Sequence, residues 1–243
     1  MLEATITRPT ETTAFRIRVY TKENAASLTA QKKLDIANLY IERYSTPKWG
    51  LPPGELKLGV LVNEIDFALC AKGGMVITVE DVSGKVVGFR LAFDFSNIID
   101  SAKGDSGLAE LVGKLRSAVD YEIGAASYTA DTCVSKSHEG NGLGRKMMDT
   151  QIAIAMAAGA PAIIGWTVDS NTRMIALYNA FGYTPISGMS GITVGSDYNV
   201  DYAPSSGKMP LRSETYQPLT YRHLIISSAG AASQHSLAGK LRK

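Results

Sequence analysis

The chain has 243 residues, of which 45% are hydrophobic and 20% charged, and its formal net charge is +2. This size and composition predict an ordinary globular protein that buries one sizeable core, with one domain favoured over two. The near-neutral charge gives no reason to expect binding to nucleic acid or to a membrane surface, and no apolar run approaches the roughly 20 residues that span a bilayer.

The first third of the chain predicts one strand and two helices. Residues 1–13 are polar and lack the apolar core of a secretory signal, so we expect a flexible lead-in and a cytoplasmic protein. Residues 15–20 alternate apolar and basic side chains, as a half-buried strand does. Residues 23–44 contain no Gly or Pro, and apolar residues within 61–69 recur at helical spacing, so each segment predicts a helix.

The middle of the chain predicts strands separated by helices. Residues 75–80 and 85–95 are strand-like and are joined by a turn-forming tetrapeptide. A helix is expected over residues 108–119. Residues 127–134 and 162–168 predict two further strands, the second being a continuous apolar run of the kind found in buried parallel strands.

The remaining elements complete a mixed α/β pattern. A helix is expected over residues 144–158, and a shorter one follows a cap at residues 170–171. Residues 187–216 are rich in Gly, Ser and Pro and predict a long loop, residues 219–226 predict a last strand, and residues 228–243 predict a flexible tail. The order of the elements predicts a mixed sheet with helices on both faces.

The most informative segment is a glycine-rich turn between a predicted strand and a predicted helix. It comprises Glu139, Gly140, Asn141, Gly142, Leu143, Gly144 and Arg145. Glycines let the backbone approach an anion closely and aim several N–H groups at it, and the helix dipole adds partial positive charge. We interpret the turn as a candidate diphosphate site, to which Arg145 adds charge. The alternative is a tight strand-to-helix turn without a ligand, since glycine clusters are common.

A second segment further along the chain carries an asparagine and a tyrosine. Tyr178 lies on a short predicted helix, where its phenol could protonate a leaving group as a general acid. The alternative is a core tyrosine, because Tyr178 shares the apolar face of that helix with Met174 and Phe181. Asn171 is a candidate ligand contact, a helix cap, or both.

Together these two segments resemble the GNAT superfamily of acyl-CoA-dependent N-acyltransferases. The family's signature Arg/Gln-x-x-Gly-x-Gly/Ala falls on residues 139–144, and its Asn followed by Leu-Tyr-x-x-x-Gly-Phe/Tyr falls on Asn171 and residues 177–183. The resemblance covers about residues 126–187. One departure is Glu139, which stands where the family usually has Arg or Gln. A carboxylate beside a diphosphate is unfavourable unless it points away or is paired.

The resemblance implies a GNAT-like central sheet, mostly antiparallel and splayed between its fourth and fifth strands, in a domain over residues 14–227. Residues 96–125 are then an insertion where the family usually has a short connection. It also implies acetyl-CoA, or another acyl-CoA, as co-substrate. Backbone amides near Cys133 and Val134 would bind the pantetheine and polarise the thioester carbonyl, and Asn171 would contact the pantetheine or the adenosine.

A general base must also take a proton from the acceptor. Asp131 is the candidate, because it lies on the strand that feeds the turn and on the same face as Cys133 by alternation. Glu80, Asp81 and Glu122 are the alternatives. A carboxylate at any of these positions is more often a solvated surface group than a base.

We therefore predict an N-acyltransferase that moves an acetyl or other acyl group from acetyl-CoA to a primary amine by direct attack in a ternary complex. The alternative is a non-catalytic acyl-CoA-binding sensor or partner-binding protein of the same fold, for which Glu139 is the best support. The expected partner is a small-molecule or peptide amine, with no nucleic acid and no membrane, and a homodimer is left open. No spacing suggests a metal site. Cys133 lacks the paired base of a nucleophile, and His138 is expected to be structural.

Overall fold

A computed structural model gives the structure of the chain as two compact units. It describes residues 3–8, 11–45, 56–103, 106–194 and 219–227. Within them, unit 1 comprises the chain up to Phe93 together with Ala130–Gln151, and unit 2 comprises Asp94–Thr129, the chain from Ile152 to residue 194, and the last strand. Strand β5 and helix α5 each continue from one unit into the other. No helix in these ranges is long and apolar enough to cross a bilayer.

Unit 1 is built on an antiparallel sheet in the order β1-β2-β3-β4. Its strands are β1 (Glu3–Arg8), β2 (Glu11–Tyr20), β3 (Met75–Glu80) and β4 (Val86–Asp94). Every residue of β3 is buried, so this strand lies in the core of the unit.

The first strand corrects the expectation of a flexible lead-in over residues 1–13. Residues Glu3–Arg8 pair antiparallel with β2, with Glu3 opposite Arg18 and Ile6 opposite Phe15. The physical reason is that this edge strand pairs through its backbone with β2, and β-branched residues such as Thr5 and Ile6 favour an extended chain. The polar composition of β1 is the reason that the sequence did not predict this strand.

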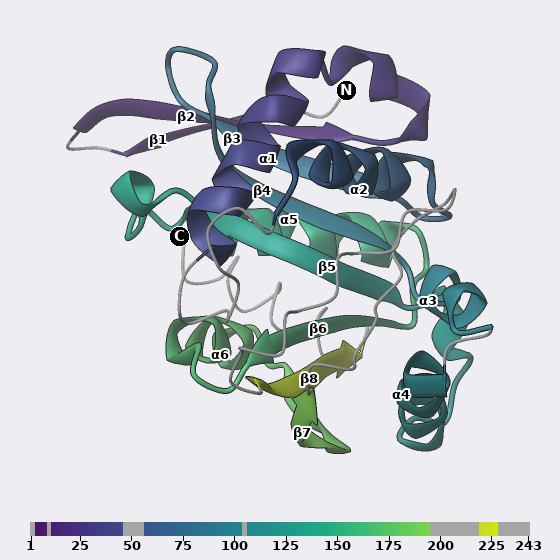
Figure 1. Ribbon diagram of the computed structural model, residues 1–243. Coiled ribbons are helices and arrows are strands. Elements are labelled where there is room, and N and C mark those ends of the chain that lie inside the picture. The colour runs from purple at the N-terminus through teal and green to yellow at the C-terminus, as the bar shows by residue number, and fades with distance from the viewer. Residues whose placement is uncertain (1–2, 9–10, 46–55, 104–105, 195–218, 228–243) are drawn as a thin grey trace. The chain divides into compact units, whose positions relative to one another are not determined.

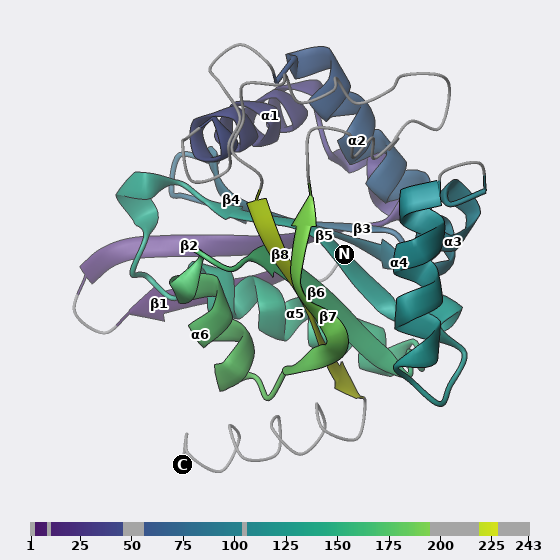
Figure 2. The ribbon, with the colours of Figure 1, turned by 60° about the horizontal axis from the view of Figure 1, so that its bottom comes forward.

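Two helices cover one face of this sheet, and the beginning of α5 lies on the other (Figures 1 and 2). They are α1 (Ala30–Tyr44) and α2 (Leu58–Cys70), which pack against each other. The single helix predicted over residues 23–44 is wrong, because a 3-10 helix (Lys22–Ser27) precedes α1. Thr29 separates the two by capping α1, where its side chain accepts a hydrogen bond from the backbone N–H of Lys32 at 3.4 Å.

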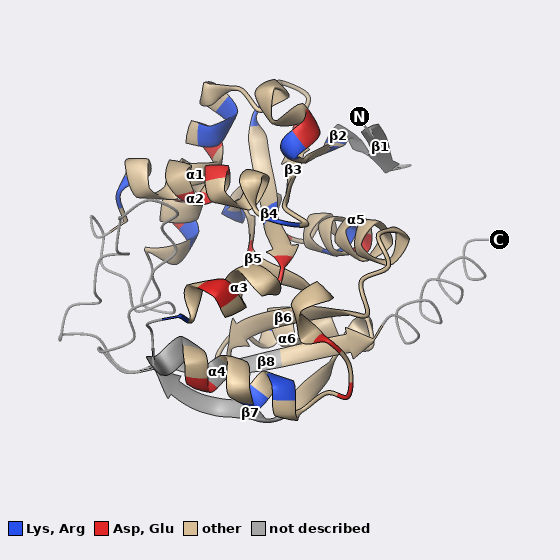
Figure 3. Cartoon of the chain, turned by 90° about the vertical axis from the view of Figure 1, so that its right-hand side faces the viewer, with Lys and Arg blue, Asp and Glu red and all other residues tan. Residues whose placement is uncertain are grey.

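Unit 2 contains strands in the order β5-β6-β8-β7, with β5 contributing its residues up to Thr129. Its elements are α3 (Ser96–Ser101), α4 (Ser106–Ser117), a 3-10 turn (Ile123–Ala125), β5 (Ser127–Val134), β6 (Ala162–Val168), α6 (Thr172–Ala180), β7 (Thr184–Val194) and β8 (Leu219–Ser227). Helix α5 (Leu143–Ala157) ends in this unit. The helix predicted at residues 108–119 is α4; it buries Val112 and Leu115 and carries charges of both signs, including an exposed Glu110–Lys114 pair (Figure 3).

The predicted fold class is confirmed as a mixed, mostly antiparallel sheet flanked by helices. The one parallel pair in unit 2 is β5 with β6, and all other pairings described in the two units are antiparallel. The parallel register contains only Ser127 opposite Ile163 and Tyr128 opposite Ile164, although β5 continues to Val134. The pairing therefore ends early, as expected of strands that splay apart.

The long loop predicted over residues 187–216 is partly wrong. Its first residues belong to β7, which pairs with β8 through a register that shifts between Pro185 and Ser190 and again before Ile192. Such bulges accommodate residues that break a regular strand, which explains why the Gly- and Ser-rich composition suggested a loop. The remainder of that loop and the predicted tail over residues 228–243 lie outside the described residues.

Candidate functional site

In unit 1, strand β5 leads through a short 3-10 turn (Lys136–His138) into the glycine-rich turn. Gly140 has φ 78° and Gly142 has φ 71°, which is the left-handed region that favours glycine. A Cβ atom added at either position would meet no atom of a non-neighbouring described residue within 4 Å. The glycines are therefore required by the backbone, and the space beside them is open to a ligand.

The start of helix α5 presents unused hydrogen-bond donors. Within the part of the chain that the structure describes, the backbone N–H groups of residues 141–144 have no hydrogen-bond partner. The first helical bond comes later, from the N–H of Lys146 to the carbonyl of Gly142 at 3.0 Å. Orphan donors at a helix N-terminus, together with the helix dipole, suit the oxygens of a phosphate group. Leu143 anchors the turn in the core, whereas Arg145 is exposed.

The carboxylate of Glu139 is paired with a cation from a distant part of the sequence. Arg43, in the last turn of α1, donates to Glu139 in a salt bridge in which both side chains are about one-third exposed (30% and 31%). The neighbouring Glu42 accepts a hydrogen bond from the backbone N–H of Lys136 at 3.2 Å. The end of α1 is thus bonded to the turn. The negative charge of Glu139, which stands where the family usually has Arg or Gln, is compensated by Arg43. No local sequence signal could have identified Arg43.

Asp131, the predicted base, is held by two tyrosines of helix α1. The hydroxyls of Tyr40 and Tyr44 donate to the same carboxylate oxygen, Oδ1, at 3.1 and 2.9 Å. Their rings are stacked with centroids 4.2 Å apart. Burial raises the pKa of Asp131 to about 7, although the bonds from Tyr44 and Tyr40 act to lower it. Near neutral pH this carboxylate can therefore exchange a proton.

A second carboxylate, which the sequence analysis did not single out, belongs to the same cluster. Glu64 of α2 has a buried Oε1 that finds no hydrogen-bond partner among the described residues. Burial, and then the negative charge of Asp131, raise the pKa of Glu64 to about 8. A sequence signal did exist, because Glu64 follows Leu61 by three residues and so falls near the buried face of α2. We call Asp131 and Glu64 the acidic pair.

Cys133 and Val134 lie at the end of β5, where the strand runs into the turn. The Cys133 side chain is buried, and burial, followed by the charge of Asp131, raises the pKa of its thiol well above the ordinary value. A thiol in that state is a poor nucleophile, in agreement with the sequence interpretation. His138 contacts Ser135 through Nδ1 at 2.7 Å and packs edge-on against Phe15, which is the structural environment expected for it.

In unit 2, Asn171 and Tyr178 both lie on helix α6. Asn171 is the N-cap, and its side chain accepts a hydrogen bond from the backbone N–H of Met174 at 3.4 Å. Tyr178 is fully buried, and its hydroxyl donates to the carbonyl of Trp166 on β6 at 3.4 Å. Gly165 makes room for it, since a side chain there would come within 2.5 Å of the hydroxyl oxygen. Gly165 and Tyr178 lie 13 residues apart, and no motif along the chain links them.

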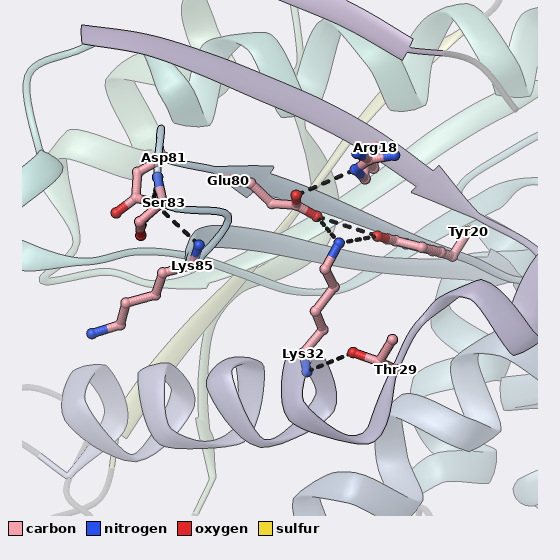
Figure 4. A network of polar contacts seen from close by, with 8 residues as sticks. All are labelled: Arg18, Tyr20, Thr29, Lys32, Glu80, Asp81, Ser83 and Lys85. Carbon is pink, nitrogen blue, oxygen red and sulfur yellow. Dashed lines mark hydrogen bonds and ion pairs between the residues drawn. The ribbon is translucent and has the colours of Figure 1, made fainter.

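The alternative bases have structural partners. Glu80 lies between Arg18 and Lys32 (Figure 4). Asp81 accepts hydrogen bonds from two backbone N–H groups of its own turn, at 2.9 and 3.1 Å. Glu122 accepts one from the backbone of the 3-10 turn that it caps, at 2.9 Å. Of the four carboxylates considered, Asp131 is the one that receives hydrogen bonds only from neutral hydroxyls.

Comparisons with known proteins agree with this architecture. Residues 62–183 match the family model described as the acetyltransferase (GNAT) family. The fold is similar to a candidate acetyltransferase from Acinetobacter baylyi ADP1, with 15% identity over 89% of this chain and 94% of that chain and a TM-score of 0.53. It is also similar to an N-acetyltransferase from Staphylococcus aureus Mu50, with 13% identity over 88% and 98% of the two chains and a TM-score of 0.50. A GNAT-family acetyltransferase from Streptococcus pneumoniae gives 12% identity over 88% and 99%, also with a TM-score of 0.50. No curated protein sequence matches the chain.

Proposed function

The chain belongs to the GNAT family of acetyltransferases, and on that premise we propose that it transfers an acetyl group from acetyl-CoA to a primary amine. The observation that carries the proposal is the row of unpartnered N–H groups over residues 141–144, at the start of α5 and beside open space at Gly140 and Gly142. These donors fit an anionic diphosphate.

Binding of acetyl-CoA would use mainly the backbone. The residues assigned to it are Cys133, Val134, Glu139, Gly140, Asn141, Gly142, Leu143, Gly144, Arg145, Asn171 and Tyr178. Among these, Glu139 would contribute through its backbone while its carboxylate stays on Arg43. Amides near Cys133 and Val134 would stabilise negative charge on the thioester oxygen, an effect typically worth about 3 kcal/mol.

The proposed chemistry is direct attack within a ternary complex. The amine nitrogen bonds to the carbonyl carbon of the thioester, and the carbon–sulfur bond breaks as the thiolate leaves. Asp131 takes a proton from the amine, directly or through water, and its raised pKa suits that exchange near neutral pH. Tyr178 gives its hydroxyl proton to the leaving thiolate. The ammonium thus loses one proton to Asp131 before the attack, and the second proton that the nitrogen loses as the amide forms returns through water to the Tyr178 phenolate.

The proposal is tested with the purified full chain, acetyl-CoA and a panel of primary amines. We expect release of free CoA thiol together with a product heavier by one acetyl group. Tyr178→Phe should lower kcat by about a hundredfold or more and change the Kd for acetyl-CoA much less, because the substitution keeps the ring and the backbone that would contact the cofactor. Tyr183→Phe is the matched control, because Tyr183 is also buried and packs against Tyr178 at 4.8 Å. An equal loss in both variants would argue against a general acid at Tyr178.

A non-catalytic acyl-CoA-binding protein of the same fold is the competing reading. Its best support was the carboxylate of Glu139, and the salt bridge to Arg43 compensates that charge. One experiment, the acetyl-transfer assay, distinguishes the two hypotheses. A sensor binds acetyl-CoA but transfers nothing to any amine, whether Tyr178 is present or replaced.

A further inference from the structure

The acidic pair consists of two half-buried carboxyl groups to which the described chain supplies no cation. The hydrogen bonds to Asp131 come from Tyr40 and Tyr44, both neutral, and no lysine or arginine in the described ranges bonds to either carboxylate. The nearby Arg43 is engaged by Glu139. Buried carboxylates are normally paired with a cation or metal, so this arrangement lacks its counterpart.

Two oxygens of the pair are left for that counterpart. Both tyrosine hydroxyls bond to Oδ1 of Asp131, and no described residue bonds to its Oδ2. The buried Oε1 of Glu64 is likewise without a partner in the described chain. Tyr40 and Tyr44, which hold Asp131, lie on α1, and α1 packs against α2, the helix that carries Glu64. The charge of Asp131 also raises the pKa of Glu64. One carboxylate comes from α2 and the other from β5, so two separate elements contribute acceptors to one place.

We propose that Asp131 and Glu64 together bind the ammonium group of the acceptor, and thereby select a small amine that carries positive charge and no carboxylate of its own. This rests on the proposed function, whose acceptor class it narrows. An ammonium ion has three N–H donors and a single charge, which match the two free oxygens and compensate the pair. A free amino acid would instead bring its own carboxylate towards two others, where like charges repel strongly.

Asp131 and Glu64 have different proposed roles. Asp131 is the base of the proposed reaction and takes the proton from the bound amine. Glu64 holds the cation in place before that transfer, so it acts mainly on affinity. The two roles predict different kinetic signatures: loss of Asp131 lowers kcat, whereas loss of Glu64 raises KM for the amine.

The test is a graded series at Glu64, compared with a carboxylate on the same helix. Glu64→Gln keeps the shape but removes the charge, and we expect KM for the amine to rise about tenfold. Glu64→Leu also removes the acceptor, and the rise should reach about a hundredfold. Asp66→Asn is the control, because Asp66 is exposed and pairs with Lys33. KM for acetyl-CoA should stay constant in all three variants.

Direct binding gives a second readout that does not need turnover. Calorimetric titration of an alkylamine into the protein saturated with CoA should show the same graded loss of affinity. Activity on alkylamines with an unchanged amine KM in both Glu64 variants would overturn this inference and leave the proposed function standing. Equal efficiency with amino acids and with alkylamines of similar size would overturn it as well. Wild-type protein that acetylates no amine would refute the proposed function, and the inference with it.

Discussion

Two sets of carboxylates in unit 1 are stabilised in different ways. Glu80 is only 2% exposed and accepts hydrogen bonds from Lys32 at 2.5 Å, from Arg18 at 3.2 Å and from Tyr20 at 3.3 Å (Figure 4). The acidic pair receives two tyrosine hydroxyls and, within the described ranges, no cation. Glu80 comes from β3, whereas Asp131 comes from β5 and Glu64 from α2. They differ in whether the chain itself provides the balancing charge.

We interpret this difference as one between a structural carboxylate, Glu80, and two functional ones, the acidic pair. A buried charge that has its own cations is tolerated by the fold, and removing one partner is strongly destabilising because it leaves an uncompensated charge. A buried charge without them is costly to the fold, and such costs concentrate at binding and catalytic sites. The contrast predicts opposite outcomes for similar substitutions: neutralising Glu80 should harm stability, and neutralising a member of the acidic pair should harm activity.

The largest effect is expected for Asp131→Asn, which tests the functional side of the comparison. Asparagine has nearly the same shape and can still accept the bonds from Tyr40 and Tyr44, but it cannot take a proton. We expect kcat to fall by about a hundredfold to ten-thousandfold. Steady-state kinetics on purified protein measure this. Asp81→Asn, which alters a carboxylate engaged in its own turn, should keep the wild-type rate.

The pH profile of the same enzyme gives an independent check on Asp131. A base acts in its ionised form, and burial places the pKa of Asp131 at about 7. The value of kcat/KM should therefore rise with pH through about 7, and it should level off only above about 8 because Glu64 must also be ionised to hold the amine. The limb near pH 7 belongs to Asp131. This acidic limb should disappear in the residual activity of Asp131→Asn. A limb that persists unchanged in the variant would assign it to another group.

Glu80→Gln tests the structural side, with the next largest effect. The change leaves Arg18 and Lys32 without their acceptor, although both cations are partly exposed (17% and 20%). We expect the free energy of unfolding to fall by about 3 to 4 kcal/mol, measured by urea denaturation. The value of kcat for the folded fraction should not change. A stable Glu80→Gln variant with lost turnover would reverse the comparison.

The pH dependence of stability sharpens the contrast further. The pKa of Glu64 is raised by burial from 4.5 to about 8, so its protonated form is favoured in the folded state. The stability linked to this group is fully present below pH 4.5 and is lost as the pH rises through 8. Glu64→Gln should therefore match the wild type near pH 4 and exceed it by about 2 to 3 kcal/mol at pH 8 to 9. Urea denaturation across this range is the measurement. A variant less stable than the wild type at high pH would contradict an uncompensated carboxylate.

The sequence predicted those features that depend on neighbours along the chain. The bounds of β3, β5 and β6 agree with their apolar runs, and the glycine spacing located the turn. Features that depend on contacts between residues far apart in the sequence were not predicted. Thr29 interrupts a helical stretch by capping, and β1 is held by pairing with β2. The salt bridge of Arg43 joins α1 to a turn 96 residues away, which no local pattern indicates, whereas helical spacing places Glu64 near the buried face of α2 without revealing its partner.

The salt bridge between Arg43 and Glu139 is intermediate between the two sets, because the carboxylate has a cation but is partly exposed. Its removal has the smallest predicted effect. Partly exposed pairs of this kind contribute about 1 kcal/mol or less to stability. The consequence for the ligand should be larger than for the fold, because Arg43→Gln leaves the Glu139 charge uncompensated beside the turn. We expect the Kd for CoA to rise about fivefold to tenfold, with kcat unchanged.

In the double variant Arg43→Gln/Glu139→Gln both charges are absent, so affinity should return to near the wild-type value. Calorimetry on the four proteins of this cycle isolates the coupling. Additive losses would mean that Arg43 contacts the ligand itself rather than neutralising Glu139.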